Sequence, residues 1–121
     1  MAMKRELRCP DGTVVATHVE MADSMWKRFC GLMMRKEFHE DQALVLSPCS
    51  SIHMFFMRFP IDVAFVNSDG KILHALHSIR PWRMSRIVFH AVAAIELPAG
   101  TLKKRGIGTG DTITLHEEDD K

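Results

Sequence analysis

The chain lacks a long apolar run, and its charges show no excess of either sign. No apolar stretch approaches the roughly 20 residues of a membrane-spanning helix, and residues 1–6 lack the apolar segment of a signal peptide. Lys and Arg number 16 against 15 Asp and Glu, so no strongly basic face is available to neutralise a phosphate backbone. These absences predict a soluble, cytoplasmic protein whose main partner is neither a nucleic acid nor a membrane.

Cysteine is scarce as well. Cys9, Cys30 and Cys49 are an odd number and have no C-x-x-C spacing. This pattern favours reduced thiols in a reducing compartment over a disulfide framework. At 121 residues the chain is long enough to bury a core without such staples, and we expect one domain over residues 1–121.

What the sequence does contain is a series of short β-branched and apolar runs separated by turn residues. A Pro-Asp-Gly turn at 10–12 predicts a hairpin of residues 1–8 with 13–19, and Asn67-Ser68-Asp69-Gly70 predicts a second hairpin of 61–66 with 71–79. Further strands are expected at 43–46, 51–58, 88–97 and 112–116. The pattern predicts a mainly β fold, an antiparallel sandwich or flattened barrel.

One helix is expected near residues 24–33. Apolar residues recur there at steps of three and four behind the potential cap Ser24, and Gly31 is suited to end the helix in a left-handed conformation. The last residues, 117–121, are acidic and are expected to form a mobile tail.

Four motifs occur in a characteristic order: G-L-M-M-R at 31–35, S-I-H-M-F-F-M-R-F-P-I-D-V-A-F-V at 51–66, A-I-E-L-P-A-G at 94–100 and G-x-G-D at 108–111. In these motifs the chain resembles the family known as domain of unknown function 192, uncharacterised small β-rich proteins, from about residue 22 to 115. The resemblance implies a jelly-roll-like sandwich and no established reaction or cofactor. Met34 and Met54 depart from the family pattern, where a glycine and a small polar residue are common, so a relative's ligand need not fit here.

Asp62 and Glu96 are isolated carboxylates in otherwise apolar runs. An unpaired buried charge costs several kcal/mol or forces protonation, so each needs a partner. Arg35, Arg58 and nearby backbone amides are the local candidates for Asp62. If the two carboxylates face each other across a cleft, they could perform acid/base work. If each pairs with an arginine, they fix strand register, and we favour this structural role.

Soft metal ligands also occur in the 51–66 motif and just before it. On a strand, Cys49, His53 and Met57 would share one face. At the rise of an extended strand, however, Cys49 and Met57 would stand roughly 26 Å apart, and Cys49 and His53 about 13 Å apart. Neither one metal ion nor a Cys/His dyad fits such spacing without a bend, so packing in the core is the preferred interpretation.

Trp82 and Arg83 lie in a basic segment between two predicted strands, a composition typical of an interface or a ligand rim. Three functions remain open. The preferred one is a non-enzymatic accessory module that binds a small ligand or a protein partner, using Trp82, Arg83 and His53. The alternatives are a small acid/base or hydrolase-like enzyme using Asp62, Glu96 and His53, and a metal-binding protein using His53, Met57 and Cys49. The candidate site residues are His53, Met57, Arg58, Asp62, Trp82, Arg83, Glu96 and Arg35.

Overall fold

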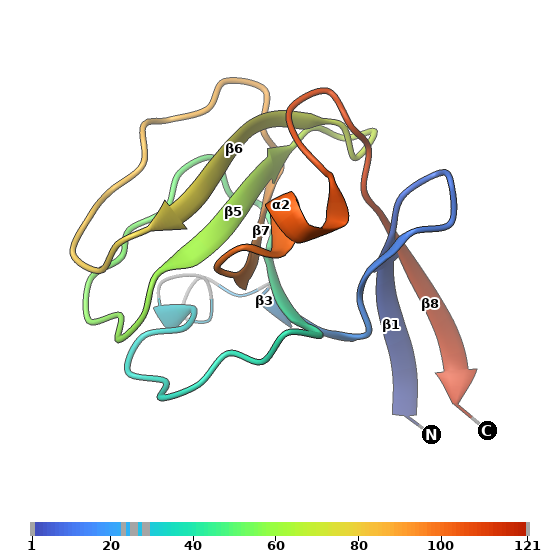
Figure 1. Ribbon diagram of the computed structural model, residues 1–121, viewed down its shortest axis with the longest axis horizontal. Coiled ribbons are helices and arrows are strands. Elements are labelled where there is room, and N and C mark those ends of the chain that lie inside the picture. The colour runs from blue at the N-terminus through green and yellow to red at the C-terminus, as the bar shows by residue number, and fades with distance from the viewer. Residues whose placement is uncertain (1, 23, 25–26, 28–29, 121) are drawn as a thin grey trace.

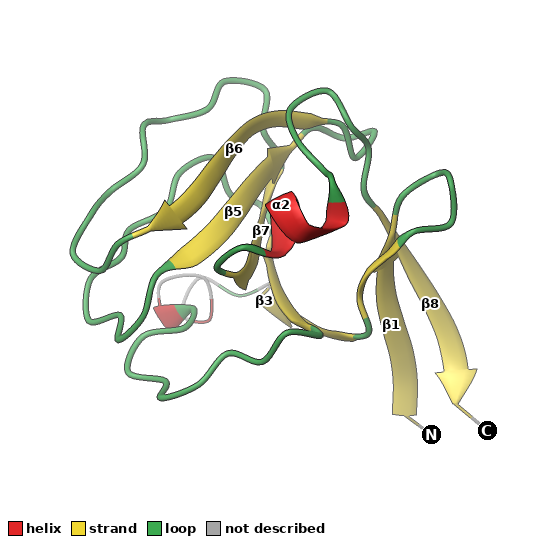
Figure 2. Ribbon diagram, viewed as in Figure 1, coloured by secondary structure: helices red, strands yellow, loops and turns green. Residues whose placement is uncertain are grey.

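The computed structural model describes residues 2–22, 24, 27 and 30–120. Its elements in chain order are β1 (Ala2–Arg8), β2 (Val14–Ala16), β3 (His18–Ala22), β4 (Gln42–Leu46), β5 (Ile61–Val66), β6 (Ile72–Ile79), β7 (Ala93–Pro98), α2 (Thr101–Arg105) and β8 (Thr114–Asp120). The described strands form two sheets and no closed barrel (Figure 2). The predicted mainly β class is therefore confirmed.

The larger sheet has five strands in the order β3-β4-β7-β5-β6, and the smaller has three in the order β2-β1-β8. The strands β1 and β8 run side by side, so the two chain ends lie together (Figure 1). One pair departs from the expected antiparallel arrangement. β3 and β4 are parallel, because the connection between them returns to the end of the sheet at which β3 begins.

The five-stranded sheet is covered on both faces, which explains why every residue of β5 is buried. One face packs against the small sheet and α2, and its core includes Ala64, Ile95, Leu97 and Leu102. The other face is covered by loops, and its core includes Val63, Phe65, Leu32, Met54 and Met57. Successive side chains along a strand point to opposite faces of the sheet, so those of β5 and β7 enter the two cores alternately.

The two predicted hairpins are present, but the returning strand of the first ends at Ala16 instead of residue 19, and His18 and Val19 belong to β3 in the larger sheet. β1 pairs with β2 around a turn at Gly12, and β5 pairs with β6 around Asn67–Gly70. In the second turn the Asn67 side chain accepts backbone N–H bonds from Asp69 and Lys71, both at 3.0 Å. Gly70 has φ of 81°, a conformation that favours glycine.

Residues 51–58 do not form the predicted strand. The chain turns within this segment, because the Met57 N–H donates to the Met54 carbonyl at 3.3 Å and Phe56 has φ of 61°. The segment's one described β-pairing with another segment is an isolated β-bridge between His53 and Met84. The segment is therefore a loop that crosses the second core instead of extending the sheet.

Other boundaries also differ from the prediction. β7 begins at Ala93 instead of residue 88, and the helix α2 occupies residues to which the sequence assigned no element. Five residues are too few to show a helical period, and α2 is delimited by Gly100 and Gly106 in left-handed conformations. The acidic residues 117–120, predicted as a tail, lie in β8 and pair with residues 2–5 of β1.

Of the helix predicted near residues 24–33, residues 25–26 and 28–29 lie outside the described residues. At the two ends of this segment, the described residues show the predicted cap at Ser24 and the predicted left-handed glycine at Gly31. The Lys27 N–H donates to Ser24 Oγ at 3.1 Å, and Gly31 has φ of 47°. In the part of the chain that is described, no helix is both long and apolar enough to cross a membrane.

Candidate functional site

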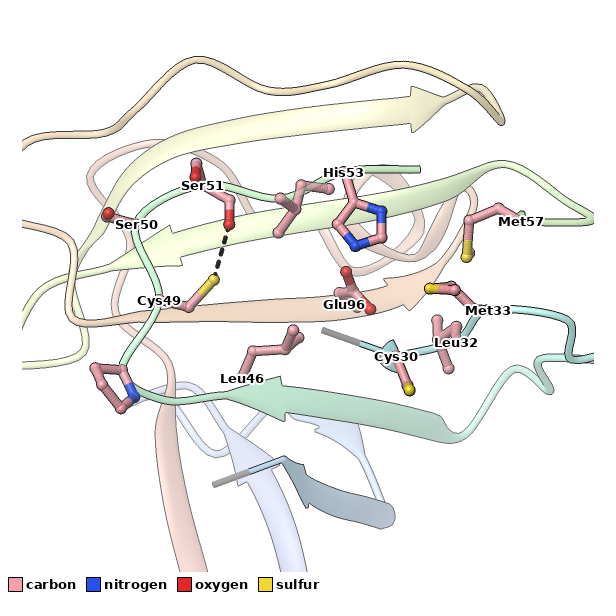
Figure 3. A pocket seen from close by; sticks show the side chains of 13 residues that line it. Cys30, Leu32, Met33, Leu46, Cys49, Ser50, Ser51, His53, Met57 and Glu96 are labelled. Atoms are coloured by element: carbon pink, nitrogen blue, oxygen red, sulfur yellow. Dashed lines mark hydrogen bonds between the residues drawn. The ribbon is translucent and has the colours of Figure 1, made fainter. Parts of the chain in front are cut away.

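A pocket of about 290 Å³ opens on the loop-covered face of the five-stranded sheet. Its walls come from the end of β4, from β7, and from two segments on either side, 30–33 and 48–57 (Figure 3). The lining residues are Cys30, Gly31, Leu32, Met33, Leu46, Pro48, Cys49, Ser50, Ser51, Ile52, His53, Met57 and Glu96. They include one carboxyl and one imidazole but no lysine or arginine.

Glu96 supplies the carboxyl. It lies in β7 between Leu44 of β4 and Val63 of β5, and its exposed fraction is 4%. No hydrogen bond joins its carboxyl to another residue among those described. Burial raises the pKa of Glu96 to about 8, against a smaller lowering by the charge of Arg35. At neutral pH this side chain is therefore mainly a neutral acid that can donate a hydrogen bond.

His53 lies across the pocket from Glu96. Its Nδ1 accepts the backbone N–H of Phe55 at 3.2 Å, and its ring stacks on that of Phe55 with centroids 5.0 Å apart. With Nδ1 as acceptor, a neutral imidazole carries its proton on Nε2. Figure 3 shows His53 and Glu96 pointing into the same space from opposite walls. The sequence-predicted residues His53, Glu96 and Met57 are thus brought together.

Four sulfur-containing side chains also line the pocket: Cys30, Met33, Cys49 and Met57. Both cysteines are free, and Cys49 Sγ donates to the Ser51 carbonyl at 3.0 Å. Cys49, His53 and Met57 share this wall because residues 48–57 are a loop, which removes the wide spacing expected for a strand. Within the described residues, however, no three His, Cys, Asp or Glu side chains are placed to hold a metal ion.

Asp62 lies elsewhere, and the hypothesis that it faces Glu96 across a cleft is wrong. In the β5–β7 register Asp62 is opposite Leu97, whereas Glu96 is opposite Val63, so the two carboxyl groups leave opposite faces of the sheet. Asp62 is fully buried and accepts two backbone N–H bonds, from Ser78 at 2.9 Å and from Leu102 at 3.0 Å. Its partners are backbone amides and not the expected arginines.

The two amides explain why a carboxylate is needed at Asp62. The register of β5 with β6 shifts between Ile61 and Val63, and at this bulge Ser78 adopts φ of 51°. Its N–H points at Asp62 instead of at a strand partner. The second amide, of Leu102, belongs to the first turn of α2, where backbone N–H groups have no partner within the helix. Asp62 therefore joins the sheet bulge to the helix.

The predicted arginines are outside the pocket. Arg35 forms a two-pronged ion pair with Glu20 of β3, with N–O distances of 3.1 and 2.7 Å, and this bond lowers the pKa of Glu20. Arg58 and Arg83 are exposed. Trp82 is 60% exposed, and its ring meets that of Phe56 with centroids 4.9 Å apart. Trp82 and Arg83 thus belong to an outer surface and not to the pocket rim that contains His53.

Residues 30–33 form a pocket wall that sequence reasoning missed. Cys30 and Met33 line it, and Gly31 and Leu32 lie between them. The G-L-M-M-R motif overlaps this wall, but nothing in its composition indicates that it faces β7. That placement depends on how the chain returns from β3 to β4, a long-range property.

The fold places the chain in a class, the mainly β proteins built of two sheets. Within it, the chain belongs to the family called domain of unknown function 192, described as an uncharacterised ACR, whose model matches residues 7–115. This confirms the family resemblance found in the motifs.

Curated relatives carry the name UPF0127 protein, which assigns no activity. The protein from Thermococcus sibiricus is 33% identical over 91% of this chain and 73% of its own length. That from Thermococcus gammatolerans is 35% identical over 85% and 69%, and that from Pyrococcus furiosus 31% identical over 88% and 94%.

Two solved structures share the fold. A Sinorhizobium meliloti protein, described provisionally as a transcription regulator, has a TM-score of 0.75 and 28% identity, covering 93% of both chains. A Novosphingobium aromaticivorans protein of unknown function has a TM-score of 0.80 at 20% identity, covering 92% of this chain and 83% of its own. This chain therefore shares its fold with both solved structures.

Proposed function

We propose that this protein is a non-enzymatic binding module whose pocket holds a small organic cation, such as a primary or quaternary ammonium group. The observation that carries the proposal is Glu96, a carboxyl that is 96% buried, unbonded to the described residues and open to the pocket. A positive group beside it would supply the hydrogen-bonding partner that the described residues do not, and would favour its ionised form.

The rest of the pocket supports a cation over an anion. Among the described residues that line it there is no lysine or arginine, and the nearby Arg35 is engaged by Glu20. The thioethers of Met33 and Met57 offer polarizable, apolar walls to the hydrocarbon part of such a ligand. A volume of about 290 Å³ is at the lower end for ligand pockets, which fits a small molecule.

Binding fits the geometry better than catalysis. Acid/base work by two carboxyl groups needs both at one centre, and Asp62 lies on the other face of the sheet. A thiol nucleophile needs a base within hydrogen-bond reach, whereas Cys49 Sγ donates to the Ser51 carbonyl. The described groups in the pocket can orient a ligand, and they support no complete set of reacting groups.

The test is proton linkage. Because Glu96 is protonated below pH about 8, binding of n-butylammonium or tetramethylammonium at pH 6.5 should release close to one proton. Titration calorimetry in two buffers of different ionisation enthalpy measures that number, and affinity should rise by up to about tenfold per pH unit between pH 6 and 8.

Glu96→Gln should abolish this binding, while Glu118→Gln, at an exposed position of β8, should leave it unchanged. Binding of neither ammonium probe to the native protein, or equal binding to Glu96→Gln, would contradict the proposal.

A soft metal ion is a second candidate, favoured by the thioethers and thiols of Met33, Met57, Cys30 and Cys49 in one pocket. Native mass spectrometry after incubation with Ag(I), a redox-inert stand-in for Cu(I), tests it. One ion per chain that is lost in Met57→Leu, but not in the exposed Met84→Leu, would support it. No retained ion would remove this candidate.

A further inference from the structure

The loop between β6 and β7 carries a surface that the pocket does not explain. We call residues 80–90 the outer loop; it runs along the edge of the molecule beyond β6 (Figure 1). Four large apolar side chains on it are largely exposed: Trp82 at 60%, Met84 at 68%, Ile87 at 60% and Phe89 at 78%. Phe56, which touches Trp82, adds a fifth at 50%. Isolated exposed apolar residues are common, but five on one short stretch of surface point to contact with a partner.

The charge on this surface has one sign. Arg80, Arg83 and Arg86 are exposed and alternate with the apolar residues along the outer loop. The sequence contains no aspartate or glutamate between residues 70 and 95. The charge of Arg86 also lowers the pKa of His74 on β6, a smaller effect than burial. The partner should therefore be anionic.

The outer loop is held in this exposed arrangement by its backbone. The Trp82 N–H donates to the Met54 carbonyl at 2.8 Å, and the Met54 N–H donates to the Arg83 carbonyl at 2.7 Å. Farther along, Ser85 N–H bonds to the Ile52 carbonyl at 2.9 Å, and Val88 is buried. The inner side of the loop is thus fixed to residues 50–54, so the apolar side chains cannot turn inward without breaking these bonds.

We propose that the outer loop docks on the surface of an anionic lipid bilayer. Apolar side chains on such a surface insert at the boundary of headgroups and acyl chains, while arginines contact lipid phosphates. The sequence predicted no membrane partner because it has no apolar run long enough to span one. A loop that binds at the interface needs no such run. The proposal does not depend on what the pocket holds.

Two other occupants fit less well. A second copy of the chain, meeting face to face, would bring Arg80, Arg83 and Arg86 against the same three arginines. A surface that binds another protein usually has an apolar centre within a polar rim, whereas charged and apolar residues alternate along the outer loop. Phe89, with 78% of its surface exposed, leaves most of its ring free to insert among lipids. Such exposure, together with the alternation of charged and apolar residues, suits a fluid interface.

The test is co-sedimentation of the full chain with vesicles of phosphatidylcholine containing 30% phosphatidylglycerol, beside vesicles of phosphatidylcholine alone. We expect binding to the anionic vesicles that weakens with salt, and at least tenfold weaker binding to the neutral ones. The pair Trp82→Ala and Phe89→Ala should reduce binding at least tenfold, and each of Arg80→Gln, Arg83→Gln and Arg86→Gln about fivefold. The matched controls Val14→Ala on β2 and Lys103→Gln on α2 should bind as the native chain does.

Each alternative gives a different result. Failure to sediment with anionic vesicles, or binding that Trp82→Ala with Phe89→Ala leaves unchanged, overturns the proposal. So does binding to poly-glutamate but not to vesicles, which would indicate an acidic protein partner, or a dimer in ultracentrifugation that Trp82→Ala dissociates. Because the substituted side chains are exposed, thermal melts should show that the variants fold as the native chain does.

Discussion

Asp62 and Glu96 leave neighbouring strands of one sheet from opposite faces, and each meets a different environment. Asp62 enters the core beneath the small sheet and α2, where two backbone amides satisfy it. Glu96 enters the loop-covered side, where it borders a pocket. Two carboxyl groups that look alike in the sequence should therefore respond oppositely to removal of their charge.

Asp62→Asn should destabilise the protein. The amide of asparagine has one oxygen, so its NH₂ group would face the N–H of Ser78 or Leu102 and leave a buried donor unpaired. The expected loss in the free energy of unfolding is about 2 kcal/mol, measured by urea denaturation at pH 7. Asp69→Asn, in the exposed turn, is the control and should change stability by less than about 0.5 kcal/mol. Equal effects of the two substitutions would show that Asp62 does not hold these amides.

Glu96 should make the native protein less stable as pH rises. Its pKa is about 8 in the folded state and 4.5 ordinarily, so between these values the folded chain binds more protons than the unfolded chain. The free energy of unfolding should then fall by about 1.4 kcal/mol per pH unit from this group. The contribution is greatest below pH about 4.5 and is lost by pH about 8.

Glu96→Gln removes this group while keeping the shape of the neutral acid. The difference in unfolding free energy between native protein and variant, measured in urea at pH 5, 6, 7 and 8, should change steadily in favour of the variant. A constant difference across that range would mean that Glu96 has an ordinary pKa.

Arg35→Gln should raise the pKa of Glu96 further. The guanidinium lowers that pKa by its charge, although its hydrogen bonds go to Glu20. Carboxyl carbon chemical shifts followed by NMR through the titration would measure the change. The exposed Lys36→Gln should leave the pKa of Glu96 as it is. A lower pKa in Arg35→Gln would contradict this assignment of the charge effect.

Gly70→Ala should be far more damaging than Gly12→Ala. Both glycines have positive φ, 81° and 92°, which costs an alanine roughly 1–2 kcal/mol. A Cβ at Gly12 would meet open space, whereas at Gly70 it would lie 2.3 Å from the carbonyl oxygen of Ile113. We expect Gly70→Ala to lose roughly 2 kcal/mol more than Gly12→Ala in chemical denaturation. Similar losses would mean that the Ile113 segment moves aside readily.

The contributions of Phe56 and Trp82 to the free energy of unfolding should be weakly coupled. Their rings meet at 4.9 Å with planes inclined by 60°, yet each is at least half exposed. A double-mutant cycle to alanine should give a coupling of about 0.5–1 kcal/mol in the free energy of unfolding. Trp82→Ala combined with Val14→Ala on β2 should be additive. A coupling near zero in the first cycle would show that the ring contact does not persist in solution.

The sequence was informative where structure follows from local rules. Asn67 and Gly70 predicted the β5–β6 turn, because a side-chain acceptor and a positive φ are properties of the turn itself. The β5 and β6 strands followed from the two runs on either side of that turn. The same rules wrongly predicted a strand at 51–58. Its apolar residues fit a strand equally well, and its turn at Phe56 contains no glycine that would indicate it.

For the candidate site, the sequence identified His53, Met57 and Glu96 but not their arrangement. It showed that Asp62 and Glu96 each need a partner, because an isolated carboxyl in an apolar run is costly wherever it is buried. It could not show that Asp62 accepts hydrogen bonds from two backbone amides, or that Glu96 borders a pocket. The amides come from a bulge in β6 and the first turn of α2, and the pocket wall at Cys30 and Met33 comes from another segment.

By itself, then, the sequence determined the mainly β class, the family, the positions of the tight turns and which residues carry unusual chemistry. Those properties depend on residue type and on short-range φ, ψ preferences. Tertiary structure decided which face each carboxyl enters, which segments close the pocket and which apolar residues of the outer loop stay in solvent. These depend on strand register and on contacts between residues far apart in the chain, such as Asp62 with Leu102, 40 positions away, which no local pattern encodes.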